Sequence, residues 1–173
     1  PHLQSFTDKF GVHGAMITAV DLLRGLAELI GWHNVHVPGA TGYTDTDYAA
    51  KGQAALETLQ TTDLVCVHVE APDEASHEGD LEKKIAAIEE IDEKIIGPLY
   101  EALIAVEKFR ILICPDHPTP VRTKTHSHGC VPFTMAGSGI PVDASCVYNE
   151  SSADASENHF SAGHTLMKYF IEH

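Results

Sequence analysis

The chain has 173 residues and carries 25 acidic against 11 basic side chains, which gives a formal net charge of −14 with histidine neutral. Its 43% hydrophobic and 21% charged residues are ordinary for a globular domain and exclude a disordered chain. The negative charge argues against a nucleic acid partner, because phosphate binding needs a basic surface, and it favours metal cations. No run of about 18 apolar residues occurs, which excludes a membrane-spanning helix. The 12 histidines stand out, since imidazole is the commonest metal ligand.

The four cysteines, Cys66, Cys114, Cys130 and Cys146, form no Cys-x-x-Cys pair. Cys66 and Cys114 lie inside apolar runs and are expected to be buried. Such scattered cysteines indicate a reducing compartment rather than a disulfide framework, so we expect a cytoplasmic protein. No signal peptide is visible, and the first residue is Pro1 rather than Met, so we expect the natural N-terminus to lie further upstream.

The predicted elements alternate between strands and helices. β-Branched apolar runs predict strands, and apolar residues spaced three and four apart predict helices. The expected elements are a strand at 14–18, a helix at 20–30, a strand at 34–37, a helix at 48–59, a strand at 64–69, a long helix at 81–106, strands at 110–114 and 131–135, and a closing helix at 161–171. Gly97-Pro98 should interrupt the long helix. This alternation predicts an α/β fold with a mostly parallel sheet covered by helices on both faces.

Acidic and histidine residues follow two of the predicted strands. The strand at 64–69 runs into EAPDEASH (70–77), and the strand at 110–114 runs into PDHPTP (115–120). A third cluster, THSH, occupies 125–128. Because functional sites of parallel sheets form at the carboxyl ends of strands, we expect the three clusters to meet at one edge of the sheet.

The spacing within these clusters suits a metal site. Asp73 and His77 are four residues apart, so a helical turn that begins at Asp73 places both side chains on one face, where they can bind one cation. Asp116 and His117 are adjacent, so they serve one ion only from an irregular turn, or they serve two neighbouring ions. Carboxylate and imidazole ligands together favour Zn, Mn, Fe or Co over Ca. Two ions about 3.5–4 Å apart can hold a transferring phosphoryl group from both sides.

Each motif alone also has an ordinary structural explanation. The Asp-x-x-x-His spacing arises by chance, an Asp-His pair before proline fits a capped turn, and His126 and His128 fit surface positions. A local zinc site at His126, His128 and Cys130 is an alternative that we favour less. Residues two apart in an extended strand all point to the same face, so they could bind an ion only from that one side. His68, inside its strand, is expected to be solvated or structural. The metal interpretation rests on the shared position of the three clusters.

The segments that carry these clusters resemble one enzyme family. HVEAPDEASHEGDLEKKIAAIEEID (68–92), CPDHPTP (114–120) and THSHGCVPF (125–133) resemble the 2,3-bisphosphoglycerate-independent phosphoglycerate mutases, specifically the archaeal-type branch. FGVHGAMITAVDLLRGLAELIG (10–31) and VPGATGYTDTDYAAKG (37–52) resemble the same branch. The resemblance covers nearly the whole chain, with the segments in the order of the family. It implies the C-terminal part of an alkaline-phosphatase-like core.

The resemblance also implies which residues bind metal. Members of the family use two divalent ions, commonly Mn or Zn, with Mg or Co as further candidates, and a serine that carries the phosphoryl group. By motif, the ligands of one ion match Asp73, His77 and His126, and ligands of the other ion match Asp116 and His117. His126 is chosen over His128 because the histidine of the family stands five residues before the Val of its Val-Pro-Phe motif.

Other parts of the family's active site match no segment of this chain. These parts are an aspartate near the N-terminus, the nucleophilic serine, and most substrate-binding arginines, which belong to an inserted domain. We therefore expect residues 1–173 to be the C-terminal part of the metal-binding catalytic domain, without the N-terminal part and the inserted substrate domain. Among the arginines present, only Arg122 lies in a loop from which it could reach a phosphate.

The resemblance implies that the longer enzyme interconverts 2-phosphoglycerate and 3-phosphoglycerate in glycolysis or gluconeogenesis through a phosphoserine. The alternatives are a metal-dependent phosphatase, another phosphomutase of the alkaline phosphatase superfamily, or an inactive metal-binding fragment. We expect the chain alone to lack mutase activity and to hold at most about one metal ion tightly, since one ligand set is complete. We also expect uncovered sheet edges near Ile17 or Val131 to promote self-association.

Overall fold

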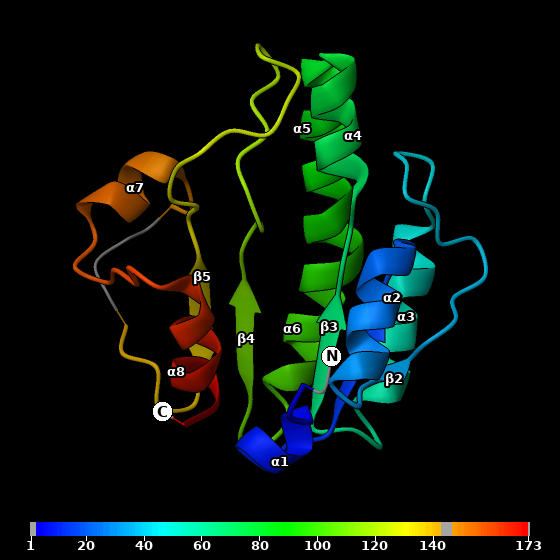
Figure 1. Cartoon of the computed structure of the whole chain (residues 1–173), viewed down its shortest axis with the longest axis vertical. Coiled ribbons are helices and arrows are strands. Elements are labelled where there is room, and N and C mark those ends of the chain that lie inside the picture. Colours follow the sequence, from blue (N-terminus) through cyan, green and yellow to red (C-terminus); the bar gives the residue numbers. More distant parts are fainter. Residues whose placement is uncertain (1–2, 143–146, 173) are drawn as a thin grey trace.

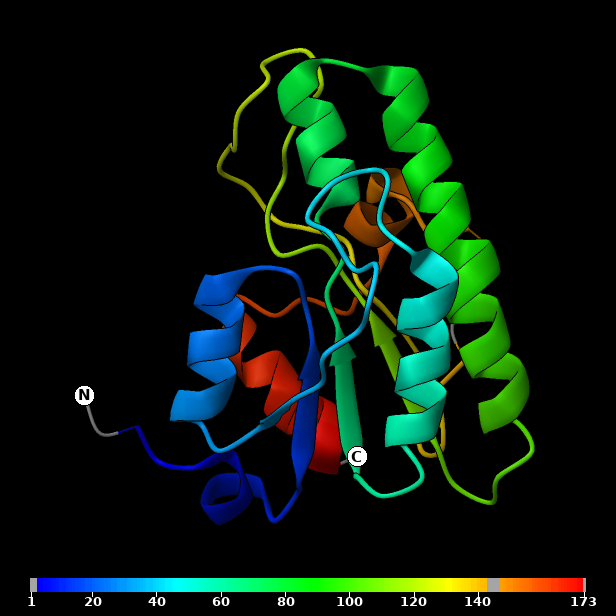
Figure 2. The ribbon, with the colours of Figure 1, turned by 90° about the vertical axis from the view of Figure 1, so that its right-hand side faces the viewer.

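The structure is a computed structural model, and it describes residues 3–142 and 147–172. Two small β-sheets stand in the middle, and helices lie around them (Figures 1 and 2). Cys146 lies outside the described residues, and the other three cysteines are free. Within the described ranges, no helix has both the length and the apolar character that a membrane crossing requires.

The first sheet is parallel, as predicted. Its central strand β1 (Gly14–Ile17) lies between β2 (His33–Asn34) and β3 (Leu64–Val67), and β1 pairs in parallel with both. The strand predicted at 34–37 is therefore shorter and begins one residue earlier. The expectation of an exposed edge at Ile17 is wrong, because β1 has a neighbour on each side and the Ile17 side chain is fully buried.

The second sheet contains two antiparallel strands, β4 (Arg110–Ile113) and β5 (Thr134–Gly137). The strand predicted at 131–135 thus begins later, and its antiparallel direction was not anticipated. A parallel return would need a crossover, usually a helix. Residues 114–133 contain no helix and form an extended loop beyond the end of β4, so the chain comes back in the opposite direction.

Helices cover both faces of the parallel sheet, in agreement with the prediction (Figure 2). The elements are α1 (Phe6–Phe10), α2 (Asp21–Leu29), α3 (Tyr48–Thr58), α4 (Ala71–Glu78), α5 (Leu81–Ile91), the π-helical segment η1 (Asp92–Ile96), α6 (Gly97–Leu103), α7 (Glu150–Ala155), the 3₁₀ turn η2 (Gly163–Thr165) and α8 (Leu166–Glu172). Helices α1 and α7 were not predicted, since each is too short to show a periodic pattern.

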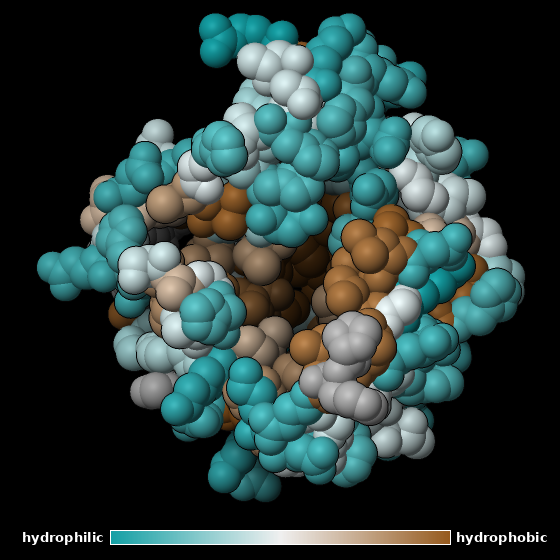
Figure 3. Space-filling model, viewed as in Figure 1, coloured by the Kyte–Doolittle hydropathy of each residue, from teal (hydrophilic) through white to brown (hydrophobic). Residues whose placement is uncertain are grey.

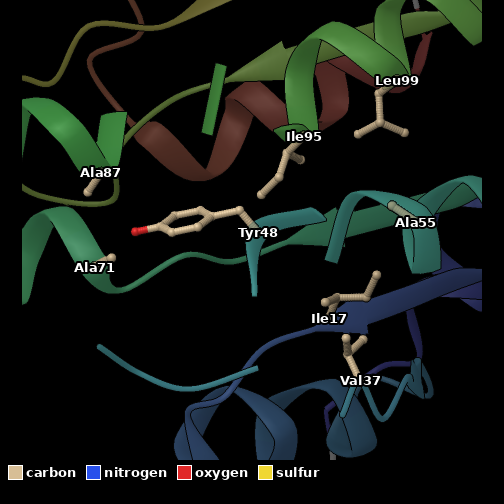
Figure 4. Packing of buried hydrophobic residues seen from close by; sticks show 8 residues of the cluster. All are labelled: Ile17, Val37, Tyr48, Ala55, Ala71, Ala87, Ile95 and Leu99. Atoms are coloured by element: carbon tan, nitrogen blue, oxygen red, sulfur yellow. The ribbon is translucent and has the colours of Figure 1, made fainter. Parts of the chain in front are cut away.

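The larger core lies between the parallel sheet and the helices α3 to α6. Figure 4 shows Ile17 of β1 facing this core, with Tyr48 and Ala55 of α3 and Ile95 of η1 packed around it. A smaller core on the opposite face gathers around Trp32 and includes residues of α1 and α2. The fold is thus a sheet between two apolar layers, which is the arrangement that parallel strands require.

The long predicted helix changes geometry at the expected place. Pro98 has no N–H, and the N–H of Gly97 bonds to the carbonyl of Asp92, five residues earlier. This π-helical turn lies against α3 at Gly52. A Cβ added to Gly52 would meet the carbonyl oxygen of Lys94 at 2.4 Å, so glycine allows the two helices to approach closely.

Candidate metal centre

Helix α4 places Asp73 and His77 on one face, as their spacing predicted. The helix follows β3 directly, with Pro72 in its first turn, where a missing N–H costs nothing. Nε2 of His77 lies 3.1 Å from Oδ2 of Asp73. Side chains four residues apart on a helix meet in this way because the turn repeats every 3.6 residues.

The loop after β4 brings two further histidines to the same carboxylate. Nε2 of His126 lies 3.5 Å from Oδ1 of Asp73 and 3.1 Å from Nε2 of His77. Nδ1 of His117 lies 4.0 Å from Oδ1 of Asp73, and the rings of His117 and His126 are 3.8 Å apart. Asp73, His77, His117 and His126 therefore form one cluster, which we call the Asp73 cluster.

Asp116 lies at the rim of the Asp73 cluster. Its side chain is 70% exposed, and Oδ2 lies 3.4 Å from Nε2 of His117. Its Oδ1 accepts a hydrogen bond from the backbone N–H of His117. The resemblance assigned Asp116 and His117 to a second ion, whereas the structure places the Nδ1 atom of His117 beside Asp73. The roles of Asp116 and His117 as metal ligands remain a prediction.

Thr119 is the buried polar residue beneath the cluster, and the sequence analysis did not single it out. Its hydroxyl donates a hydrogen bond to Oδ1 of Asp73 and lies 3.1 Å from Nδ1 of His117. Burial of Asp73 acts to raise its pKa, but the Thr119 hydroxyl and the neighbouring histidines outweigh it and lower the pKa of this carboxyl. Asp73 is thus held as an anion among imidazoles.

The histidine loop is fixed to α4 through Lys124. The backbone carbonyl of Lys124 lies 3.0 Å from Nδ1 of His77. The Nζ of Lys124 donates a hydrogen bond to the carbonyl of Glu78 at the end of α4. Lys124 adopts a left-handed backbone with φ of 56°, which is uncommon for a residue with a side chain. With Nδ1–H donated to this carbonyl, Nε2 of His77 keeps its lone pair directed at the cluster.

A second group of polar side chains borders the cluster at the end of β3. The half-buried His68 contacts the Thr18 hydroxyl through Nδ1 and Glu70 through Nε2. Lys51 of α3 is fully buried and donates to the carbonyl of His68. Burial lowers the pKa of Lys51, and the negative charge of Glu70 partly opposes this shift. The prediction that His68 is structural agrees with these bonds, but its position beside the site was missed.

The Asp73 cluster has the donor chemistry of a site for Zn, Mn or a similar ion. Ligand atoms on a tetrahedral ion with bonds of about 2.1 Å are separated by about 3.4 Å. The ring nitrogens of the three histidines lie 3.1 to 4.0 Å from the carboxylate oxygens of Asp73. Two Nε2 atoms that face each other need a proton or a cation between them. The carboxylate and imidazoles therefore fit a divalent ion, which is the chemistry the sequence predicted.

The alternative zinc site is not formed. In the described parts of the chain, the groups of potential ligands that lie close together are Asp73 with His117 and His126, and Glu70 with Asp73 and Glu74. Neither group contains His128 or Cys130, and both of these residues are exposed.

Comparison with known proteins is consistent with this chemistry. The Metalloenzyme superfamily matches residues 1–168. A protein of Methanothrix thermoacetophila named 2,3-bisphosphoglycerate-independent phosphoglycerate mutase is 48% identical over 99% of this chain and 44% of its own length. A protein of Geobacter sulfurreducens, named a probable enzyme of this kind, is 44% identical over 99% of this chain and 43% of its own length. The chain thus spans less than half the length of these relatives.

Solved structures show the same fold. A protein of Pyrococcus horikoshii superposes with a TM-score of 0.88 at 29% identity, over 98% of this chain and 51% of that protein. The cofactor-independent phosphoglycerate mutase of Thermoplasma acidophilum superposes with a TM-score of 0.74 at 23% identity, over 99% of this chain and 39% of its own. The second likeness supports the fold alone.

Proposed function

The chain belongs to the metalloenzyme superfamily, and on this premise we propose that it is the metal-binding C-terminal part of a 2,3-bisphosphoglycerate-independent phosphoglycerate mutase. The observation that carries the proposal is the meeting of Asp73 and His77 of α4 with His117 and His126 of the loop after β4. The relatives are named phosphoglycerate mutases, and the reaction that we propose is the interconversion of 2-phosphoglycerate and 3-phosphoglycerate. We place the enzyme in the cytoplasm, which its free cysteines favour.

Two divalent ions, Mn or Zn, would occupy the complete site. Asp73, His77 and His126 would hold one ion, while Asp116 and His117 would contribute to the other together with ligands from outside this chain. Bound ions of this kind lower the pKa of an attacking hydroxyl and neutralise charge on a phosphoryl group. The serine that accepts the phosphoryl group would also come from outside these 173 residues.

The residues of this chain prepare the ligands. Asp73 supplies a carboxylate whose lowered pKa keeps it charged, and the Thr119 hydroxyl orients it. The carbonyl of Lys124 selects the tautomer of His77. Such supporting hydrogen bonds fix ligand geometry before an ion binds, which reduces the cost of assembling the site.

Substrate binding needs arginines from elsewhere. Arg24 donates to the Thr18 carbonyl and pairs with Asp21, and Arg110 donates to three backbone carbonyls. Arg122 is exposed in the loop that carries the cluster and makes no ion pair within residues 3–142 and 147–172. One arginine is too few to hold both the phosphate and the carboxylate of a phosphoglycerate through reorientation.

A coupled assay tests the proposal. The unmatched part of the Methanothrix thermoacetophila relative, joined ahead of this chain, should convert 3-phosphoglycerate into 2-phosphoglycerate with added Mn²⁺ and without 2,3-bisphosphoglycerate. Turnover should be lost with Asp73→Asn and retained with His128→Ala, since His128 lies outside the cluster. Release of inorganic phosphate without isomerisation would instead show a phosphatase.

A further inference from the structure

Among the residues that the structure describes, Lys51 is the charged side chain that lies fully inside the fold. Figure 3 shows hydrophilic residues mostly around the outside of the visible face and hydrophobic residues in the hollow at its centre. Cys66 and Cys114 were expected to be buried, but Cys66 is half-buried and Cys114 is exposed. A fully buried ammonium costs free energy unless nearby groups compensate it, so the position of Lys51 needs a physical reason.

Lys51 occupies a core position of helix α3. The buried residues of this helix are Tyr48, Lys51, Gly52 and Ala55, and their spacing of three and four places them on one face. Tyr48 and Ala55 of this face lie in the larger core (Figure 4). Leucine or methionine would fill such a position without a charge, so hydrophobic packing alone does not explain a lysine there.

The groups around the ammonium belong to the segment that joins β3 to α4. Nζ of Lys51 donates to the backbone carbonyl of His68 at 3.3 Å. Burial lowers the pKa of Lys51, and the charge of Glu70 opposes this shift, so the Glu70 carboxylate lies within electrostatic reach of the ammonium. A single buried charge thus acts on two of the three residues between the strand and the helix.

His68 and Glu70 form a directed chain of hydrogen bonds with Thr18. The Thr18 hydroxyl accepts a hydrogen bond from the N–H of Val20, so its proton is available to Nδ1 of His68, 3.2 Å away. Nε2–H of His68 then faces the Glu70 carboxylate, also 3.2 Å away. This tautomer needs a neutral ring. Burial lowers the pKa of His68, and the charge of Lys51 lowers it further against the effect of nearby carboxylates.

Glu70 connects this chain of bonds to the metal centre. It is the N-cap residue of α4, and its backbone carbonyl accepts hydrogen bonds from the N–H groups of Asp73 and Glu74. Its side chain does not cap the helix and contacts His68 instead. A displacement of Glu70 would therefore move Asp73, which is the carboxylate of the Asp73 cluster.

We infer that Lys51 is a positioning residue of the metal centre. Its buried charge holds the His68 carbonyl and the Glu70 carboxylate, and through them the first turn of α4, which carries Asp73. The inference rests on the proposed metal site and adds to it a residue that touches none of the ligands. A charge kept for the site rather than for the fold has a specific signature: its removal weakens metal binding without weakening the fold.

The variant Lys51→Met tests the inference, because methionine fills a similar volume without a charge. In this chain, the dissociation constant for Zn²⁺, measured by calorimetric titration, should rise about 10-fold or more, as for other groups that orient metal ligands. The midpoint of urea unfolding without metal should stay equal or rise, since an apolar side chain replaces a buried charge. The visible absorption bands of bound Co²⁺ should shift, because they report ligand geometry.

Two further variants separate positioning from stability. Gly52→Ala lies next to Lys51 in α3 and should disturb packing against Lys94 without touching the segment at 68–70. It should lower the unfolding midpoint and leave the Zn²⁺ affinity and the Co²⁺ bands unchanged. In a double-mutant cycle, Lys51→Met and Glu70→Gln together should weaken binding by much less than the product of their separate effects, since both remove the same interaction.

Equal Zn²⁺ affinity in Lys51→Met and the unmodified chain would overturn the inference and leave the proposed metal site standing. An equal loss of affinity in Gly52→Ala, or affinity and stability that fall together in Lys51→Met, would show a structural role only. Multiplicative effects in the cycle would show that Lys51 does not act through Glu70. Failure of the unmodified chain to bind Zn²⁺ would overturn the proposed site itself, and the inference with it.

Discussion

The Nε2 atom of His77 lies 3.1 Å from the Nε2 atom of His126, although 49 residues separate them in the chain. Two imidazole nitrogens at this distance repel when both are protonated and share a cation when both are neutral. The folded chain therefore holds an arrangement that a divalent ion stabilises.

Removal of the Thr119 hydroxyl should weaken metal binding. Thr119→Val keeps the shape of the side chain but removes the hydrogen bond to Asp73 and the contact with His117. We expect the affinity for Zn²⁺, measured by calorimetric titration, to fall about 10-fold or more, as for other groups that orient metal ligands. Thr123→Val is the control, because the exposed Thr123 hydroxyl bonds to the backbone carbonyls of Pro120 and Thr125. Equal affinities in all three proteins would show that Thr119 does not position the ligands.

Gly52 should be far less tolerant of substitution than Gly25, although both lie inside helices. A Cβ at Gly52 would meet the Lys94 carbonyl at 2.4 Å, whereas nothing lies within 4 Å of a Cβ at Gly25. We expect Gly52→Ala to lower the free energy of unfolding by about 1–3 kcal/mol through overpacking. Gly25→Ala should raise it by about 0.5–1 kcal/mol, since alanine favours a helix. Urea denaturation measures both, and similar effects at the two positions would contradict the packing of α3 on η1.

The stability of the chain should fall in alkaline solution. Burial raises the pKa of Cys66 from 9.0 to about 11, so between these values the unfolded chain binds fewer protons than the folded chain. The free energy of unfolding must then decrease as pH rises through this window. Two pKa units correspond to about 2.7 kcal/mol, and we expect about 1–2 kcal/mol because the side chain is partly exposed.

Cys66→Ala should remove this part of the pH dependence. Burial also raises the pKa of Tyr148 to about 12. Tyr148→Phe should therefore reduce the fall in the free energy of unfolding that begins above pH 10, and should leave the fall between pH 9 and 10 nearly unchanged. Unfolding by urea at several pH values measures both effects. An unchanged slope between pH 9 and 11 in Cys66→Ala would show that this thiol titrates alike in the folded and unfolded chains.

Local patterns in the sequence predicted the parts of the structure that depend on local geometry. The i,i+4 spacing of Asp73 and His77 defines a helical face wherever that helix packs, and the structure shows the contact. The Gly97-Pro98 pair predicted a break because a missing N–H acts within one turn, and a π-helical turn occurs there.

Features that depend on distant parts of the chain were not predictable in this way. The place of Thr119 under Asp73 depends on how the loop after β4 folds back over α4, and no spacing encodes that path. β3 and β4 belong to separate sheets, and the pairing of strands depends on contacts between distant segments. Strand propensity therefore identified both strands but not how they pair.

The number and location of tightly bound metal ions test the central claim most directly. After saturation with Mn²⁺ or Zn²⁺ and dialysis, elemental analysis of this chain should find about one ion per molecule, because the proposed ligands Asp73, His77 and His126 of one ion all lie within it. Asp73→Asn and His77→Ala should each abolish this binding, whereas His128→Ala should retain it. No retained ion, two retained ions, or an ion that persists in both cluster variants would contradict the assignment of the Asp73 cluster as the metal site.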